Sequence, residues 1–135
     1  MSGNLKEKAF KIVKQRNLCS YMNDTKWSEL RSAMLNDMPF PPPYAMKTLF
    51  EDCGEDISED VYHIGDWYEG FCIGEYFNGG FAVEWIKVRT RILKYRGLLI
   101  SPEVLDETAE FVGVLKKYNI HYEEKDGIYT IYGYR

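Results

Sequence analysis

The stretch that decides the fold is FAVEWIKVRTRIL, residues 81–93. Apolar and polar side chains alternate along it, and a period of two is typical of a β-strand with one buried face. From Ile86 onward the better core face is one alternating set: Ala82, Glu84, Ile86, Val88, Thr90 and Ile92. The opposite face then receives three cations, Lys87, Arg89 and Arg91. We therefore predict a strand over 81–93 with a basic outer face.

The residues that follow predict an amphipathic helix over 102–118. Ser101 is suited to the N-cap, Pro102 to the first helical position, and Glu103 to the positive end of the helix dipole. The predicted buried stripe comprises Val104, Leu105, Phe111, Val112, Leu115 and Tyr118. We expect this helix to pack on the sheet.

The end of the sequence predicts a β-hairpin. Two strand-like runs, 120–124 and 128–134, are joined through Asp126-Gly127. This dipeptide tolerates the positive φ angles that a tight hairpin turn requires. A terminal hairpin is therefore expected.

Two helices are predicted before the sheet. The first covers residues 4–16, and the second begins after Asp24 or Thr25 and ends before the prolines of 39–43. The apolar stripe of the second helix is Trp27, Leu30, Ala33, Met34 and Met38. Residues 44–50 are compatible with a helix or a strand, and 61–64 and 67–73 are further strand candidates.

These elements predict one α+β domain over residues 1–135. Its parts are two N-terminal helices, a mostly antiparallel sheet over residues 61–99, one long helix packed on it and a C-terminal β-hairpin. A chain of 135 residues is long enough to fold around one core without metal or disulfide staples.

The composition predicts a cytoplasmic protein without a cofactor. No apolar run is long enough for a signal peptide or a membrane span, so we expect no membrane partner. Cys19, Cys53 and Cys72 are widely spaced and odd in number, which favours buried free thiols over disulfides or a zinc site.

Charge is segregated along the chain. Residues 48–84 contain ten Asp or Glu and no Lys or Arg, whereas residues 85–97 contain five bases and no acid. The acidic block has two interpretations: a solvated loop that aids solubility, or an anionic face that steers and binds a cationic protein. Nucleic acid is disfavoured as a partner, because only the short run from Lys87 to Arg96 offers the basic footprint that phosphates need.

Motifs with an established chemistry are absent from the sequence, which contains no P-loop, G-x-G-x-x-G, H-E-x-x-H or G-x-S-x-G pattern. His63, Asp66, Glu69 and Cys72 are spaced three apart, but glycines interrupt the segment and prevent one shared helical face. We therefore predict no catalytic residues and no metal site. Trp67 and Tyr68 follow Gly65-Asp66, where they either flank a turn or face a partner.

Several segments resemble a family of small uncharacterised bacterial proteins. They are TKWSEL at 25–30, PPY at 42–44, GDWY at 65–68, VEWI at 83–86 and the tail from YNIHYEE at 118–124 to IYGY at 131–134. The resemblance spans residue 25 to the end and implies a bacterial, cytoplasmic domain of unknown function. Small acidic domains of this kind also look like immunity proteins, which neutralise a cationic toxin by binding it.

The sequence thus favours a non-enzymatic protein-binding domain. Its predicted binding residues are Glu55, Asp56, Glu59, Asp60, Asp66, Trp67 and Tyr68. The alternative is a small metal-dependent hydrolase or nuclease-like enzyme that uses Asp66, Glu69 and Glu84, with Arg89 and Arg91 holding an anionic substrate. A homodimer in which the basic strand meets the acidic segment of a second copy is a third hypothesis.

Overall fold

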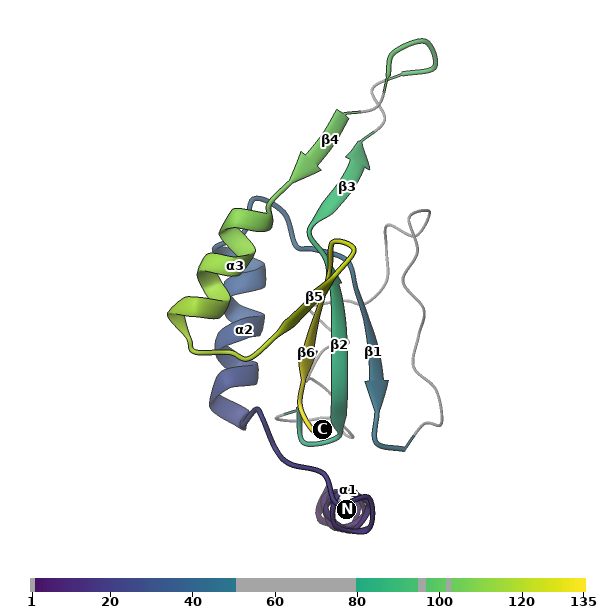
Figure 1. The fold of residues 1–135 in the computed structure, drawn as a ribbon, viewed down its shortest axis with the longest axis vertical. Coiled ribbons are helices and arrows are strands. Elements are labelled where there is room, and N and C mark those ends of the chain that lie inside the picture. The colour runs from purple at the N-terminus through teal and green to yellow at the C-terminus, as the bar shows by residue number, and fades with distance from the viewer. Residues whose placement is uncertain (1, 51–79, 95–96, 102) are drawn as a thin grey trace.

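The computed structural model describes residues 2–50, 80–94, 97–101 and 103–135. These residues form an α+β fold, as predicted (Figure 1). Its elements in chain order are α1 (Ser2–Gln15), α2 (Asp24–Asn36), β1 (Tyr44–Thr48), β2 (Val83–Arg89), β3 (Arg91–Lys94), β4 (Glu103–Asp106), α3 (Thr108–Lys117), β5 (Glu123–Lys125) and β6 (Ile128–Tyr132).

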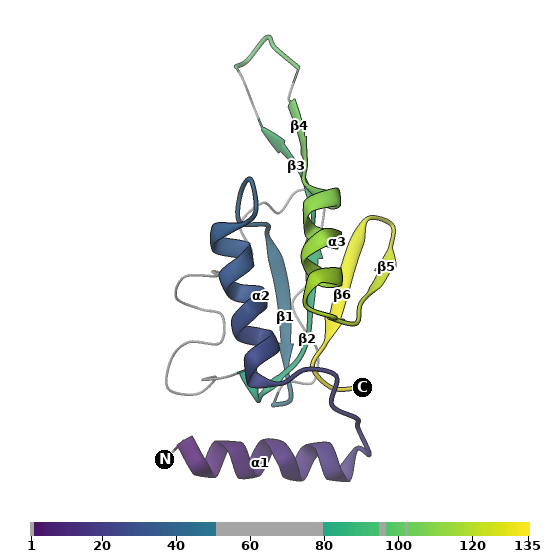
Figure 2. The same cartoon turned by 90° about the vertical axis from the view of Figure 1, so that its left-hand side faces the viewer.

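The main sheet contains four described strands in the order β1-β2-β6-β5, and every neighbouring pair is antiparallel. Helices α2 and α3 lie side by side over one face of this sheet (Figure 2). The core between the two layers includes Leu30, Met34, Ile86, Val88, Phe111, Leu115 and Ile131, all of them buried. Apolar burial between helices and sheet is therefore the main force holding this fold together.

Helix α1 lies across one end of the sheet, apart from the α2–α3 layer (Figure 2). Its buried Ala9 packs in a smaller cluster with Leu49, Phe81 and Ala82. The chain leaves the helix through Asn17, whose φ of 56° is left-handed, as expected for a residue that closes a helix. The smaller cluster is thus what attaches α1 to the sheet.

The second helix forms where the sequence predicts it, with a different cap. Asn23 is the N-cap of α2, and its side-chain oxygen accepts a hydrogen bond of 2.8 Å from the Lys26 backbone nitrogen. Trp27, Leu30, Ala33 and Met34 are buried on the predicted stripe.

The continuous strand predicted over 81–93 is wrong in one respect, because it is divided between two sheets. Strand β2 ends at Arg89, Thr90 is buried at the junction, and Arg91 begins β3 in a separate two-stranded sheet. The predicted inner face is correct for Ile86, Val88 and Thr90. Lys87 and Arg89 therefore share the outer face of β2, while Arg91 belongs to a different structure.

The helix predicted from Pro102 is also wrong at its start, because residues 103–106 form β4 and α3 begins at Thr108. Strand β4 pairs with β3, which satisfies backbone groups that a helix would have satisfied internally. Val104, predicted to be in the core, is 59% exposed. Strands β3 and β4 with the connecting residues 97–101 project from one end of the molecule, opposite α1, and we call them the arm (Figure 1).

The C-terminal hairpin is confirmed. Asp126 and Gly127 have φ angles of 53° and 80° and form the turn between β5 and β6. The first strand is shorter than predicted, and β6 also pairs with β2, so the hairpin completes the main sheet.

The predictions of buried cysteines and of two early strands have different outcomes. Cys19 is exposed and not buried, because it lies in the link between α1 and α2 that pairs with the C-terminal residue Arg135. The strand candidates 61–64 and 67–73 lie outside the described residues, as do Cys53 and Cys72. Among the helices that the structure describes, none is long and apolar enough to cross a membrane.

Candidate functional site

The seven predicted binding residues lie in one segment, residues 51–79, which is outside the part of the chain that the structure describes. They are Glu55, Asp56, Glu59, Asp60, Asp66, Trp67 and Tyr68. Their role in binding remains a prediction from the sequence. Among the described residues, β1 ends at Thr48 before this segment and β2 begins at Val83 after it.

Glu84, the last acid of the block, is part of an internal ion-pair cluster. Its carboxylate oxygen Oε1 accepts a hydrogen bond of 2.8 Å from the buried Lys47 Nζ and another from the Arg16 guanidinium. Burial would raise the pKa of Glu84, but the hydrogen bonds from Arg16 and Lys47 and their positive charges outweigh it and lower the pKa below its ordinary value. Glu84 is therefore ionised and links the turn after α1 to β1 and β2.

An irregularity in the sheet positions Glu84. The register between β1 and β2 shifts between Lys47 and Thr48, whose partners are Trp85 and Val83, so Glu84 has no residue opposite it. Such a bulge redirects a side chain and bends the strand. The Glu84 backbone carbonyl accepts from the backbone nitrogens of Gly133 and Tyr134 at 2.7 and 3.1 Å, which fixes the bulge from the other side.

This cluster bears on the hydrolase hypothesis. Glu84 is held by two cations of its own chain, and Arg91 pairs with Asp106 in the arm, so the structure does not bring Glu84 and Arg91 to one site. Arg89 stays on the outer face of β2, and its buried Nε atom has no hydrogen-bond partner among the described residues. Within the same residues, no group of three His, Cys, Asp or Glu side chains is arranged to hold a metal ion.

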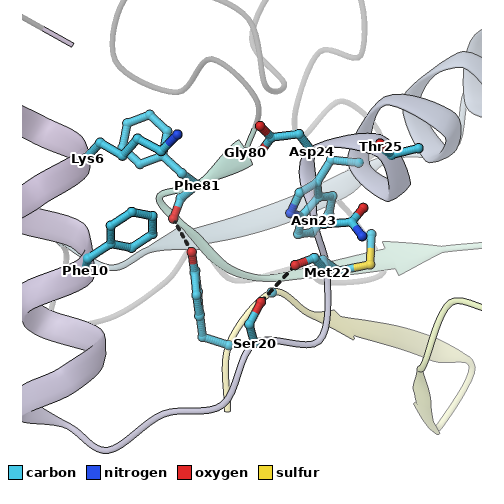
Figure 3. A pocket seen from close by; sticks show the side chains of 12 residues that line it. Lys6, Phe10, Ser20, Met22, Asn23, Asp24, Thr25, Gly80 and Phe81 are labelled. Carbon is cyan, nitrogen blue, oxygen red and sulfur yellow. Dashed lines mark hydrogen bonds between the residues drawn. The ribbon is translucent and has the colours of Figure 1, made fainter. Parts of the chain in front are cut away.

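A pocket of about 450 Å³ lies between α1 and the start of α2 (Figure 3). Two of its hydroxyl groups already bind backbone carbonyls of the chain: the Ser20 hydroxyl donates to the Met22 carbonyl and the Tyr134 hydroxyl to the Phe81 carbonyl, both at 2.8 Å. The buried ring of Trp27 forms another part of the wall. These contacts stabilise the pocket but supply no pairing of a nucleophile with a base.

The arm is the most exposed apolar structure among the described residues. Leu98 and Leu99 are fully exposed at its tip, and Ile100 is 54% exposed. Along the strands, Arg91 pairs in register with Asp106, and Leu93 with Val104. Exposed apolar patches of this kind mark contact surfaces, whereas single exposed leucines are common on any protein. Sequence reasoning missed this surface because it assigned β4 to a helix.

A buried acid lies at the base of the arm. Glu107 joins β4 to α3 and is 0% exposed; its backbone nitrogen donates to the Thr90 carbonyl at 2.9 Å. Burial raises the pKa of Glu107 to about 8, with a smaller contribution from the negative charges of Glu110 and Asp106 and an opposing one from the Phe40 backbone nitrogen. Glu107 is therefore mostly protonated at neutral pH, and sequence reasoning gave no sign of it.

The comparison with known families covers nearly the whole of this structure. A model described as a family of unknown function (DUF6678) matches residues 9–135. The chain belongs to this family. The matched region includes the Glu84 cluster, the arm and every described strand, and it starts within α1. The predicted resemblance to a family without an assigned function is confirmed.

No curated protein and no solved structure matches the chain. The family description likewise assigns no activity. Function must therefore be argued from the residues of this family member.

Proposed function

We propose that this chain is a non-enzymatic protein-binding domain, and specifically a bacterial immunity protein that neutralises a cationic toxin in the cytoplasm. The contact surface in this proposal is the acidic segment, with Glu55, Asp56, Glu59 and Asp60 supplying charge and Trp67 and Tyr68 supplying apolar area. Aromatic residues beside charges are frequent anchors of protein interfaces.

The observation that carries the proposal is the division of charge between this segment and the rest of the chain. Residues 51–79 contain nine of the 21 acids and no base, whereas the remaining residues contain 17 bases and 12 acids. The net charge of -4 therefore combines a strongly anionic segment with a cationic remainder. An anionic segment of this kind speeds association with a cationic protein and contributes to specificity.

The contacts of Glu84 exclude it from the proposed binding surface. It lies in the acidic block by sequence, yet its carboxylate is bound by Lys47 and Arg16 inside the fold. The partner-binding acids are accordingly those before β2. Glu84 serves the stability of the domain.

The test compares how much partner protein two tagged chains capture from the native cell lysate. One is the wild type, and the other is a fourfold variant in which the acids Glu55, Asp56, Glu59 and Asp60 are changed to Lys. We expect the wild-type chain to retain a stoichiometric basic protein that is lost at high salt, because surface electrostatics are screened within about 3 Å at 1 M salt. The variant should fold normally and retain none. A control variant reverses four exposed acids elsewhere, Glu7, Asp37, Glu110 and Glu124.

Two results would contradict the proposal. One is undiminished capture by the fourfold variant, and the other is equal loss of capture in the control variant, which would indicate an effect of net charge alone. A rise in melting temperature at micromolar divalent metal would instead support the metal-dependent hydrolase, because a ligand that binds the folded state stabilises it.

A further inference from the structure

The arm has an ordered arrangement of charge. In its register, Arg91 of β3 lies opposite Asp106 of β4, and Lys94 of β3 lies opposite Glu103 of β4. One strand thus carries the bases and the other the acids. Arg91 Nε donates to Asp106 Oδ2 at 2.9 Å, and both side chains remain open to solvent, with 68% and 43% of their surface exposed.

The arm also has more apolar surface than its own two strands can cover. Val104 is 59% exposed on β4, and beyond it the tip presents Leu98, Leu99 and Ile100. A two-stranded ribbon is marginally stable in water by itself, and no other strand among the described residues pairs with β3 or β4. Unpaired strand edges and apolar side chains favour association with another surface. The arm is therefore an element that gains stability from a partner.

Charge complementarity identifies that partner. Consider two arms that stack face to face about a two-fold axis parallel to the arm. Strand β3 of each copy then lies over β4 of the other, so each Arg91 lies opposite an Asp106 of the second copy. By the same register, Val104 of each copy lies over position 93 of the second copy. The other two-fold arrangements lay each strand beside its own copy, where bases meet bases and acids meet acids, which is destabilising. Opposite charges therefore meet only when the two arms lie parallel, with β3 of each copy over β4 of the other.

We propose that the arm joins two copies of this chain into a symmetric dimer, in which the arms point the same way and their tips pack together. This goes beyond the binding of a cationic protein, because it uses none of the residues of the acidic segment. Each contributing strand has only four residues, so the contact is small and the dimer is a weak one. A two-fold contact of this kind closes on itself and does not propagate into fibres.

A lipid surface fits the same tip less well. Only helices and closed barrels satisfy every backbone group within a bilayer, and an open two-stranded ribbon does not. On the strands behind the tip, Arg91 and Asp106 form an exposed ion pair.

The first test measures mass against concentration by sedimentation equilibrium of the full chain. We expect the average mass to rise from 15.9 kDa toward twice that value as protein concentration increases. The double variant Leu98→Ser/Leu99→Ser should remain monomeric with an unchanged melting temperature, because both side chains are fully exposed and make no internal contact to lose. The control Phe10→Ser removes a half-exposed ring from α1 and should still dimerise.

The second test uses two charge-reversed variants, Arg91→Glu and Asp106→Lys. Each alone should stay monomeric, because like charges then face one another across the two-fold axis. Mixed in equal amounts, they should form a heterodimer of about wild-type affinity, since acidic arms meet basic arms. A melting temperature for each variant separates this effect from the loss of the Asp106 contact to the Thr108 backbone nitrogen.

Three results would overturn the proposal. These are a wild-type mass of 15.9 kDa at the highest concentration, a dimer that survives in the Leu98→Ser/Leu99→Ser variant, and folded charge variants that remain monomeric when mixed. Binding of the monomeric chain to anionic vesicles through the same tip residues would assign the arm to lipid and would equally refute it.

Discussion

Glu107 allows a quantitative prediction, because its carboxyl group is buried at the base of the arm and pairs with no cation among the described residues. Its pKa is raised by burial from 4.5 to about 8. The folded state therefore holds a proton that the unfolded state releases, and this group's contribution to stability falls as pH rises between these two values. Each pH unit in this window costs about 1.4 kcal/mol, so the loss reaches about 3 kcal/mol at pH 7.

The substitution Glu107→Gln keeps the size and the acceptor oxygen of the side chain but removes the titration. The free energy of unfolding, measured by urea denaturation from about pH 5 to about pH 9, should fall less steeply with pH in the variant than in the wild type. We expect the variant to gain about 2.5 kcal/mol relative to wild type between the acidic end of this range and pH 7. If the new amide NH2 group lacks a hydrogen-bond partner, its burial lowers the stability of the variant. That cost is the same at every pH, so it would shift the plot of unfolding free energy against pH without changing its slope.

The control for this experiment is Glu110→Gln, an exposed neighbour on α3. It removes one negative charge near Glu107 and should change the slope only slightly. Parallel stability curves for wild type and Glu107→Gln would refute the reasoning, because they would show that Glu107 ionises in the folded protein as easily as in the unfolded chain.

Two further substitutions test the sheet. Glu84→Gln leaves the buried Lys47 without its counter-charge and should cost about 3 kcal/mol in urea denaturation, whereas an unchanged stability would mean that the ion-pair cluster contributes nothing. Gly133→Ala places a Cβ 2.1 Å from the Val83 carbonyl oxygen and should cost at least about 2 kcal/mol, measured by thermal melting. Its matched control, Gly113→Ala, meets no atom within 4 Å inside α3 and should stabilise the protein by up to about 1 kcal/mol.

Sequence patterns predicted those parts of the fold in which local chemistry and burial agree. The Asp126-Gly127 turn has the positive φ angles expected of its residues, and the apolar stripe from Trp27 to Met34 is buried on α2. The alternation of β2 was also informative, since Ile86 and Val88 lie in the core. In each case the local preference and the tertiary contacts favour the same structure.

The arm was not predictable in the same way, because local signals contradict the structure there. Ser101, Pro102 and Glu103 are typical of a helix start, and Val104 and Leu105 continue the helical period. Pairing with β3 overrides these preferences, and Asp106 then accepts from the Thr108 backbone nitrogen where α3 begins. The buried state of Glu107 follows from this tertiary arrangement and has no local signature.

The two proposed interactions depend on different forces and can be separated by salt. Capture of a cationic partner by the acidic segment relies on exposed charges, so it should weaken steeply as salt is added. Dimerisation through Leu98, Leu99 and Ile100 relies mainly on apolar burial, which salt does not screen. The attraction between Arg91 and Asp106 adds little affinity, because an exposed ion pair is worth less than about 1 kcal/mol. These residues select the partner strand mainly through repulsion, since like charges that face one another oppose an already weak dimer. A dimer that persists at a salt concentration that abolishes capture would therefore show that the arm and the acidic segment act as independent surfaces.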